Sequence, residues 1–369
     1  MRRLLVLERI SAFVRDHVQP VETVLDGDSA HAELARLREL AKSAGLWALP
    51  LPRELGGGGL DLATYFGLAE AEGRSDHGPT ALGSASLLDV RMFRAHASEA
   101  VRERYLKSLV AGEITGSYAM TEPGVAGSDP AASRTTAARV AGGWVLSGRK
   151  WFTTGAGTAA YVTVLAGGSL FVVPTGSPGF RVVREIPVLG ASGQFEIEVA
   201  EVFVPAEHLL GEGGDGLAIA GTRLALGRTL RCLRWIGQAE RAFELMCARA
   251  TTRQVRGSAL ADRQLVQQHV FEALLAIRSA RALTRQAAEL VAAEQDARTE
   301  IGLAKVAAAR TLQQVTDSAT QVFGAEGLGP DTPLPMLSRI ARTARILDGA
   351  DELHVSATAR RVLARGRAD

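Results

Sequence analysis

Apolar side chains change their spacing twice along the chain, and the two changes divide it into three segments. Up to about residue 116 they recur every three or four positions, as they do on one face of a helix. One such face is made by Leu4, Leu5, Ile10, Phe13 and Val14, and a second by Leu34, Leu37, Leu40, Ala41 and Leu46. The pattern therefore predicts helices that pack against one another in the first segment.

The middle segment, from Tyr118 to about residue 210, contains short β-branched runs separated by Gly and Pro. These runs lie at 144–146, 161–165, 170–173, 180–183 and 195–199. Short β-branched runs with this punctuation are typical of strands. We therefore expect antiparallel strands that form a small barrel or sandwich.

Helical spacing returns in the last segment. Long amphipathic runs at 224–252, 261–294, 296–323 and 334–363 predict four antiparallel helices, which would form a bundle. The predicted fold class is α+β and mostly α. It has an N-terminal helical domain over 1–117, a central antiparallel β-domain over 118–215 and a C-terminal four-helix bundle over 216–369.

The composition is that of a globular protein. The chain has 369 residues, of which 47% are hydrophobic and 22% charged, enough for large apolar cores. Its formal net charge is only +2, so it has no basic field to hold nucleic acid or an anionic membrane. Glu8, Arg9, Arg15 and Asp16 interrupt the first apolar run. That run is therefore expected to be neither a secretory signal nor a membrane span.

No group of residues in the sequence has the spacing of a metal site. Cys232 and Cys247 lie in one predicted helix and suit neither a disulfide framework nor metal coordination. Asp351, Glu352 and His354 lie too close together along one helix to converge on an ion, so we expect a solvated helix start or a cofactor contact there. These patterns predict a reduced, cytoplasmic protein without bound metal.

Two loops rich in Gly, Ser and Thr, at 121–129 and 153–157, are separated by a single strand-like run. Each loop offers hydroxyl groups and unhindered backbone N–H groups, and glycine lets the chain approach a flat or anionic ligand closely. The loops could therefore be two sides of one ligand site. They could also be a pair of ordinary hairpin turns, which is the common origin of a Gly/Ser cluster taken alone.

The residues of these loops resemble the two signature segments of the acyl-CoA dehydrogenase flavoproteins. The first segment reads MTEP at 120–123 and AGSD at 126–129, and the second reads GRKWFTTG at 148–155. PRELGGGG at 52–59 resembles a further loop of the family, and the order helix, strand, helix is that of its fold. The resemblance covers nearly the whole chain. It implies FAD bound between the central domain and the helical bundle, and across a subunit boundary.

The resemblance also assigns contacts to individual residues. The cofactor set is Tyr118, Met120, Thr121, Phe152, Thr154, Arg253, Gln321, Gly324, Ala350 and Glu352, and the substrate set is Ser128, Arg228 and Gly349. Phe152 stands where the family usually has Trp against the flavin ring, and Thr154 where a hydroxyl bonds near flavin N5. Arg253 resembles the residue that reaches the flavin pyrophosphate of a neighbouring subunit. An additional residue, Val125, lengthens the first loop and could shift Ser128.

Asp348 occupies the position of the family's catalytic base, which is usually Glu. By resemblance, its carboxylate would remove the α-proton of an acyl thioester while flavin N5 accepts hydride from the β-carbon. The thioester carbonyl would be polarised by a flavin ribose hydroxyl and the backbone N–H of Ala350. Because Asp is one methylene shorter than Glu, about 1.5 Å of reach, Asp348 must be brought closer to the substrate.

Three interpretations of Asp348 remain open. One is a dehydrogenase with an Asp base, because one branch of the family reads Asp-Gly-Pro-Asp-Glu-Val-His where this chain has DGADELH at 348–354. The second is a flavin oxidase of the same fold, since nitroalkane oxidases also use an Asp base. The third is an Asp that caps the last helix in a non-catalytic homologue that binds FAD or acyl-CoA.

The resemblance thus implies an oxidoreductase of fatty acid metabolism. The implied reaction is α,β-dehydrogenation of an acyl-CoA, with electrons passed to an electron-transfer flavoprotein. An acyl-carrier-protein substrate is an alternative, and the branch with Asp is associated with branched or hydroxylated chains. Because the cofactor is shared between subunits in the family, a homodimer or homotetramer is expected.

Overall fold

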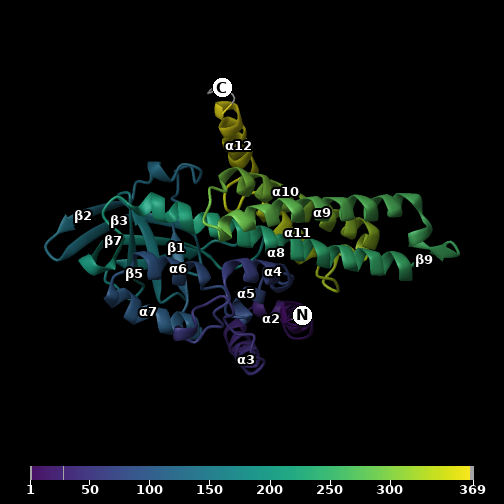
Figure 1. The fold of residues 1–369 in the computed structure, drawn as a ribbon, viewed down its shortest axis with the longest axis horizontal. Coiled ribbons are helices and arrows are strands. Elements are labelled where there is room, and N and C mark those ends of the chain that lie inside the picture. The colour runs from purple at the N-terminus through teal and green to yellow at the C-terminus, as the bar shows by residue number, and fades with distance from the viewer. Residues whose placement is uncertain (1, 28, 366–369) are drawn as a thin grey trace. The chain divides into compact units, whose positions relative to one another are not determined.

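The structure is a computed structural model that describes residues 2–27 and 29–365 (Figure 1). The chain folds into two compact units. The first unit contains the residues up to Glu22, those of Asp61–Pro79 and those from Ala225 onward, and the second contains Thr23–Leu60 and Thr80–Leu224. Each unit draws on more than one sequence segment, so the predicted domain boundaries at 117 and 215 stay a prediction.

The described residues are mostly helical, and the helical first and last segments and the sheet-forming middle segment are confirmed. The α-helices are α1 (Arg2–Phe13), α2 (Glu22–Leu25), α3 (Ala30–Ser43), α4 (Leu62–Glu72), α5 (Gly78–Ala81), α6 (Leu87–His96), α7 (Glu99–Ala111), α8 (Gly216–Thr252), α9 (Gln264–Ala292), α10 (Arg298–Phe323), α11 (Leu334–Ala344) and α12 (Asp351–Arg365). The strands are β1 (Gly116–Ala119), β2 (Thr136–Val140), β3 (Gly143–Thr154), β4 (Tyr161–Ala166), β5 (Ser169–Pro174), β6 (Phe180–Glu185), β7 (Gln194–Pro205), β8 (Leu209–Leu210), β9 (Gln254–Val255) and β10 (Ser258–Ala259).

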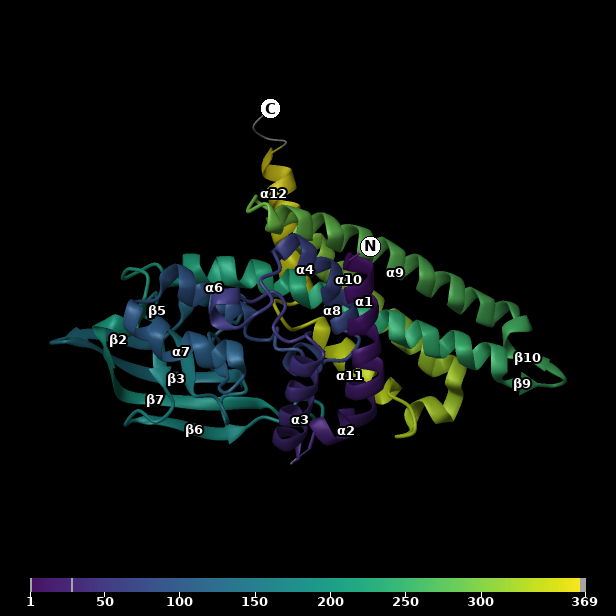
Figure 2. The ribbon, with the colours of Figure 1, turned by 60° about the horizontal axis from the view of Figure 1, so that its bottom comes forward.

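The first unit is built on long helices, of which α9 and α10 run alongside each other (Figures 1 and 2). Its apolar core is rich in alanine, whose small side chain lets helix backbones approach closely. Larger side chains such as Trp235, Ile277 and Leu312 fill the remaining space. The prediction of one helix over 334–363 is wrong, because the structure has two helices there, α11 and α12. The break contains Asp348 and Gly349, whose φ values of 56° and 95° cannot continue a right-handed helix.

Helix α1 confirms only part of its predicted apolar face. Ile10, Phe13 and Val14 are buried, but Leu4 and Leu5 are exposed. At 100° per residue, Leu4 and Leu5 project about 120–140° away from Ile10, so the two leucines lie off the buried stripe.

The second unit carries two four-stranded sheets, with strand orders β1-β4-β5-β8 and β2-β3-β7-β6. One apolar core draws on both sheets, including Val162 and Phe171 from the first and Leu146 and Ile197 from the second, so the sheets form a sandwich. Strands β6, β7 and β3 lie next to one another (Figure 2). The pairs are antiparallel as expected, except that β1 pairs with β4 in parallel. A parallel pair needs a long connection, which here contains β2 and β3.

Local signals explain where several helices begin and end. The carboxylate of Asp61 accepts the Thr64 N–H at 2.8 Å and caps α4. The Ser98 hydroxyl accepts the Val101 N–H at 3.3 Å and caps the start of α7, so that α6 and α7 are separate helices. In the part of the chain that the structure describes, no helix is both long and apolar enough to cross a membrane.

Candidate active site

The predicted site residues fall into three groups. Tyr118, Met120, Thr121, Ser128, Phe152 and Thr154 belong to the second unit, and Arg228, Asp348, Gly349, Ala350 and Glu352 lie together in the first unit. Arg253, Gln321 and Gly324 also belong to the first unit, but at a different place in it.

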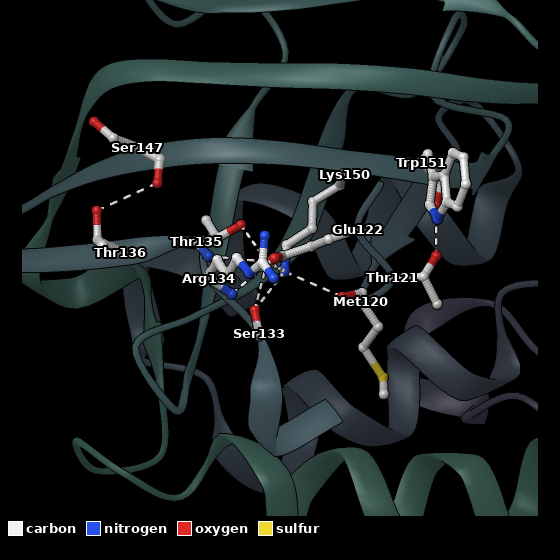
Figure 3. Close-up of polar contacts among 10 residues, drawn as sticks. All are labelled: Met120, Thr121, Glu122, Ser133, Arg134, Thr135, Thr136, Ser147, Lys150 and Trp151. Carbon is white, nitrogen blue, oxygen red and sulfur yellow. Dashed lines mark hydrogen bonds and ion pairs between the residues drawn. The ribbon is translucent and has the colours of Figure 1, made fainter. Parts of the chain in front are cut away.

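Hydrogen bonds join the two signature segments of the second unit. The backbone N–H of Trp151 donates to the carbonyl oxygen of Thr121 at 3.0 Å, and the Thr121 hydroxyl donates to the carbonyl oxygen of Trp151 at 2.7 Å (Figure 3). The Ser117 hydroxyl donates to the carbonyl oxygen of Thr154 at 2.7 Å. The loop at 121–129 and the end of β3 therefore lie side by side.

A buried ion pair also connects these two segments. Lys150 Nζ lies 2.8 Å from Glu122 Oε1, and both side chains are buried (Figure 3). Lys150 Nζ also donates to the carbonyl oxygen of Met120 at 3.1 Å and to the Ser133 hydroxyl at 3.0 Å. One ammonium thus ties strand β3 to the start of the 121–129 loop.

The Glu122 carboxylate has further donors from the segment before β2. The Ser133 hydroxyl donates to Oε1 at 2.5 Å, and the backbone N–H groups of Arg134 and Thr135 donate at 2.7 and 2.9 Å. Burial acts against ionisation, but the hydrogen bonds from Lys150, Ser133 and Thr135 outweigh it and lower the pKa of Glu122 to about 2. Burial lowers the pKa of Lys150, and Glu122 partly offsets this effect. Glu122 is therefore ionised at every physiological pH.

Phe152 occupies an irregular position in strand β3. The pairing register with β7 shifts between Lys150 and Thr153, and Phe152 has a φ of 48°. This left-handed conformation is costly for an aromatic residue, by about 1–3 kcal/mol, and strain of this kind is concentrated at functional sites. The Phe152 side chain is 45% exposed, and its ring centroid lies 4.9 Å from that of Trp151. The bulge therefore presents an aromatic face to the outside.

Thr154 and Tyr118 differ in what they offer a ligand. The Thr154 hydroxyl is exposed and bonds the Gln194 amide, with the Gln194 Nε2 at 3.0 Å. The Tyr118 hydroxyl is buried without a hydrogen-bond partner among the described residues, and burial raises its pKa to about 12. The guanidinium carbon of Arg223 lies 4.0 Å from the Tyr118 ring centroid, and Arg223 also donates to Asp89 at 2.9 Å. In this conformation Tyr118 can reach a ligand only through its other atoms.

A shallow hollow lies beside the first loop. It is lined by Met120, Thr121, Glu122, Val125, Ala126, Gly127, Asp129, Pro130 and Ser133. The additional residue Val125 is thus part of the hollow, while Ser128 is exposed next to it.

Asp348 lies in the loop between α11 and α12. Its backbone carbonyl oxygen accepts Arg228 Nε at 2.8 Å and lies 3.0 Å from His354 Nε2. Its carboxylate is 24% exposed, with Oδ2 3.6 Å from Arg231 Nε. Because α12 begins at Asp351, Asp348 is not at the cap position of that helix, so the predicted capping role is wrong. The non-catalytic homologue stays an open interpretation.

His354 and Gly349 shape this loop. Burial lowers the pKa of His354, so its ring is neutral at neutral pH and carries its proton on Nε2, which donates to the Asp348 carbonyl. A Cβ atom at Gly349 would lie 2.9 Å from His354 Nε2, and the φ of 95° also favours glycine. Ala350 is partly buried next to it, and Glu352 is exposed.

Asp351 differs from the solvated helix start that we expected. Its carboxylate is 1% exposed and faces three cations, with Lys305 Nζ at 3.1 Å, Arg345 Nε at 2.9 Å and Arg310 Nε at 3.3 Å. Burial opposes its ionisation, but hydrogen bonds from Arg345 and Lys305 outweigh this and lower the pKa of Asp351. Among the described residues, no cluster of His, Cys, Asp and Glu side chains is arranged to hold a metal ion.

Arg253, Gln321 and Gly324 lie far from Asp348 along the helices of the first unit. Gln321 and Gly324 are at the end of α10, whereas Lys305, which meets Asp351, is near its start. The rise of 1.5 Å per residue places Gly324 about 28 Å along the helix from Lys305. Arg253 follows α8, and the end of α8 is tied to this region by Arg249, whose guanidinium lies 2.8 Å from Glu326.

Two of the buried ion pairs, Glu122 with Lys150 and Asp351 with Lys305, lie beside the predicted site residues and were not expected from the sequence. One signal was available, because Lys305 interrupts an apolar stripe of α10 that includes Ile301, Ala308 and Leu312. A charged residue in such a stripe requires a buried counter-charge.

Comparison with known proteins gives a consistent result. Family models described as the N-terminal, middle and C-terminal domains of acyl-CoA dehydrogenase match residues 3–113, 117–202 and 214–363. The "probable acyl-CoA dehydrogenase FadE2" of Mycobacterium tuberculosis is 36% identical, with 97% of this chain and 94% of that protein aligned. "Acyl-CoA dehydrogenase family member 11" of Mus musculus is 32% identical over 96% of this chain.

The chain spans about half the length of that mouse protein, 49%, and of its rat counterpart. Among solved structures, one from Mycobacterium abscessus that is assigned to the acyl-CoA dehydrogenases superposes with a TM-score of 0.92 at 32% identity. The superposition covers 99% of this chain and 98% of the other.

Proposed function

The chain belongs to the acyl-CoA dehydrogenase family, and from this membership we propose that it oxidises an acyl thioester between its α- and β-carbons with Asp348 as the base. The observation that carries the proposal is the Asp348 loop. It presents an accessible carboxylate on a backbone held in a left-handed conformation by contacts from two helices. Costly backbone conformations persist where the surrounding structure maintains them, which is typical of functional sites.

Asp348 is the better base of the two aspartates in this segment. A base must reach the proton that it removes, and the Asp348 carboxylate is 24% exposed. The Asp351 carboxylate is buried and engaged by three cations, which lower its pKa and its basicity. The geometry therefore favours Asp348 for proton abstraction.

The residues around Asp348 have roles that suit this reaction. Arg228 and His354 hold its peptide carbonyl, so the base starts from a fixed position. The backbone N–H of Ala350 donates to no acceptor among the described residues and is available to polarise a thioester carbonyl. Arg231 Nε lies 3.6 Å from Oδ2 of the carboxylate and restrains it from the side of α8.

The residues of the second unit fit the cofactor that members of this family bind, which is FAD. Phe152 offers an exposed aromatic face, and the hydroxyl of Thr154 is exposed at the end of the same strand. A Cβ at Gly124 or Gly155 would meet no atom within 4 Å, so the backbone of both loops is open to a flat ligand. Bound there, FAD would supply the acceptor for the hydride that leaves the β-carbon.

A shared cofactor and a homodimer or homotetramer are also part of the proposal. Gly324 lies about 28 Å along α10 from Lys305, which meets Asp351, and Gln321 and Arg253 belong to the same region as Gly324, so the three residues would serve the cofactor of a second copy. Helix α9 exposes Leu265, Phe271 and Leu275, with exposed fractions of 76%, 66% and 56%. Large exposed apolar side chains on one helix are typical of an interface between protein chains. We propose an electron-transfer flavoprotein as the electron acceptor.

The test is an anaerobic titration of the flavin-loaded protein with a panel of acyl-CoAs and acyl-carrier-protein thioesters. We expect at least one thioester to bleach the flavin absorbance. Asp348→Asn should slow the bleaching by about 10²–10⁴-fold while the flavin stays bound, because the general base is lost. Asp317→Asn, the same change at an exposed position of α10, is the matched control.

Two results would contradict the proposal. If no thioester bleaches a flavin-loaded protein, the chain does not oxidise this class of substrate under these conditions. If Asp348→Asn bleaches as fast as the wild type, another group removes the proton.

A further inference from the structure

The loop that carries Asp348 is closed at its two ends by Arg345 and Asp351. The backbone N–H of Asp351 donates to the carbonyl oxygen of Arg345 at 3.1 Å. The side chains of the same two residues are also hydrogen-bonded, because Arg345 Nε donates to Asp351 Oδ2 at 2.9 Å. The Arg345 guanidinium is also held from α10 by Gln313 Oε1 at 3.1 Å.

The closure is anchored inside the first unit by Lys305, which is fully buried. Its Nζ donates to Asp351 Oδ1 at 3.1 Å, while Arg345 and Arg310 use Oδ2. Burial lowers the pKa of Lys305, and the hydrogen bond to Asp351 acts against that shift. Lys305 therefore depends on Asp351, because its ammonium would otherwise be buried without this counter-charge, whereas Asp351 would keep Arg345 and Arg310.

The part of the loop inside this closure has an unusual backbone. Asp348 and Gly349 are consecutive residues in left-handed conformations, with φ values of 56° and 95°. A non-glycine residue enters this region only where its surroundings hold it there. Arg228 and His354 hold the Asp348 carbonyl from outside, and the Arg345–Asp351 closure restrains the loop from its ends.

We propose that Asp351 is a positioning residue, whose carboxylate, held by Lys305 and Arg345, closes the 345–351 loop and sets the place of the Asp348 carboxylate. The expected effect on catalysis rests on the proposed function. The expected effect on the conformation of the 345–351 loop does not. It makes Asp351 a residue that acts through Asp348, without contact to the substrate. Misplacing a reacting group by about 1 Å can slow a reaction by about 10²-fold.

The first test measures flavin reduction in single turnover by the thioester that bleaches the wild type. Asp351→Asn keeps the size of the side chain and removes its charge. We expect the rate constant for flavin reduction to fall by about 10–100-fold, while the FAD content and the dissociation constant of the thioester change by less than about threefold. The control is again Asp317→Asn, which should behave as the wild type.

A second variant covers the case in which Asp351→Asn does not fold. Arg345 is 35% exposed, and Arg345→Met removes one side of the closure while the buried Asp351 carboxylate keeps Lys305 and Arg310 as counter-charges. It should slow flavin reduction in the same way but by less, because Lys305 still holds Asp351. Lys305→Met and Asp351→Asn remove the same interaction. The double variant should therefore reduce its flavin no more slowly than the slower of the two single variants.

The third measurement does not use the reaction. Hydrogen exchange of the peptide that covers 345–354 reports on the Asp351 N–H and the loop amides. We expect exchange to be at least about tenfold faster in Asp351→Asn and Arg345→Met than in the wild type, and unchanged in Asp317→Asn. If no thioester bleaches the wild type, the proposed function fails, and this exchange result alone decides whether Asp351 holds the loop.

Two outcomes would overturn the inference. One is an Asp351→Asn protein that is folded, flavin-loaded and as fast as the wild type, with unchanged exchange. The other is an Asp351→Asn protein that is inactive while Asp348→Asn remains active, because Asp351 would then be the base itself.

Discussion

Removing the charge of Glu122 is expected to destabilise the second unit strongly. Glu122→Gln keeps the shape of the side chain but leaves the Lys150 ammonium, which is fully buried, without its counter-charge. Breaking a buried ion pair from one side costs about 3–5 kcal/mol, because the remaining charge stays buried. Lys150 Nζ retains the Met120 carbonyl and the Ser133 hydroxyl as acceptors, so we expect the lower end, about 3 kcal/mol.

Urea unfolding followed by tryptophan fluorescence measures the loss of stability of the second unit. Trp47, Trp144 and Trp151 all belong to the second unit, and Trp151 pairs directly with the loop that Glu122 holds. With an m-value of about 3 kcal/mol/M, a loss of about 3 kcal/mol lowers the midpoint by about 1 M. Glu198→Gln is the matched control, because Glu198 pairs with Arg181 on an exposed sheet face and such pairs contribute about 0–1 kcal/mol.

Two further results are expected for the Glu122–Lys150 pair. Glu122→Gln combined with Lys150→Met should be more stable than Glu122→Gln alone, since the uncompensated charge is removed. The pKa of Glu122 is lowered to about 2, so its contribution is complete above the unfolded pKa near 4.3 and is lost as the pH falls toward 2. A Glu122→Gln protein no less stable than Glu198→Gln, or a double variant less stable than Glu122→Gln, would show that Glu122 does not compensate a buried charge.

Two other predictions concern the loop of the first unit. Gly349→Ala should destabilise the protein by about 1–3 kcal/mol in thermal unfolding, since its Cβ would lie 2.9 Å from His354 Nε2 at a φ of 95°. Gly213→Ala, where a Cβ meets no atom within 4 Å, should be close to neutral, and an equal effect of the two would contradict the steric argument. Burial lowers the pKa of His354 in the folded protein. As the pH falls below about 6.5, His354 therefore binds a proton in the unfolded chain before it does so in the folded protein. The free energy of unfolding should consequently rise with pH from about 5 to about 7. His354→Gln should flatten that rise in urea midpoints measured across this range, whereas His31→Gln, at an exposed position, should leave it unchanged.

The sequence determined which kind of element each segment forms. Spacing of apolar residues is a local property, so the runs at 161–165 and 170–173 could be identified as strands before their pairing was known, and they are β4 and β5. The signature segments at 120–129 and 148–155 likewise led to the family, which the comparisons confirm. For the same reason the prediction continued the last helix through Asp348, since a break of a few residues hardly changes an apolar period.

Contacts between distant segments decide which charged residues are buried and what holds them. Glu122 meets Lys150 across 28 positions, and Asp351 meets Lys305 across 46. The free energy of a buried charge depends on the counter-charges around it, and these come from elements that local patterns cannot place together. The same long-range contacts give Phe152 and Asp348 their left-handed backbone, because no local preference of Phe or Asp would select it and only the packed surroundings maintain it.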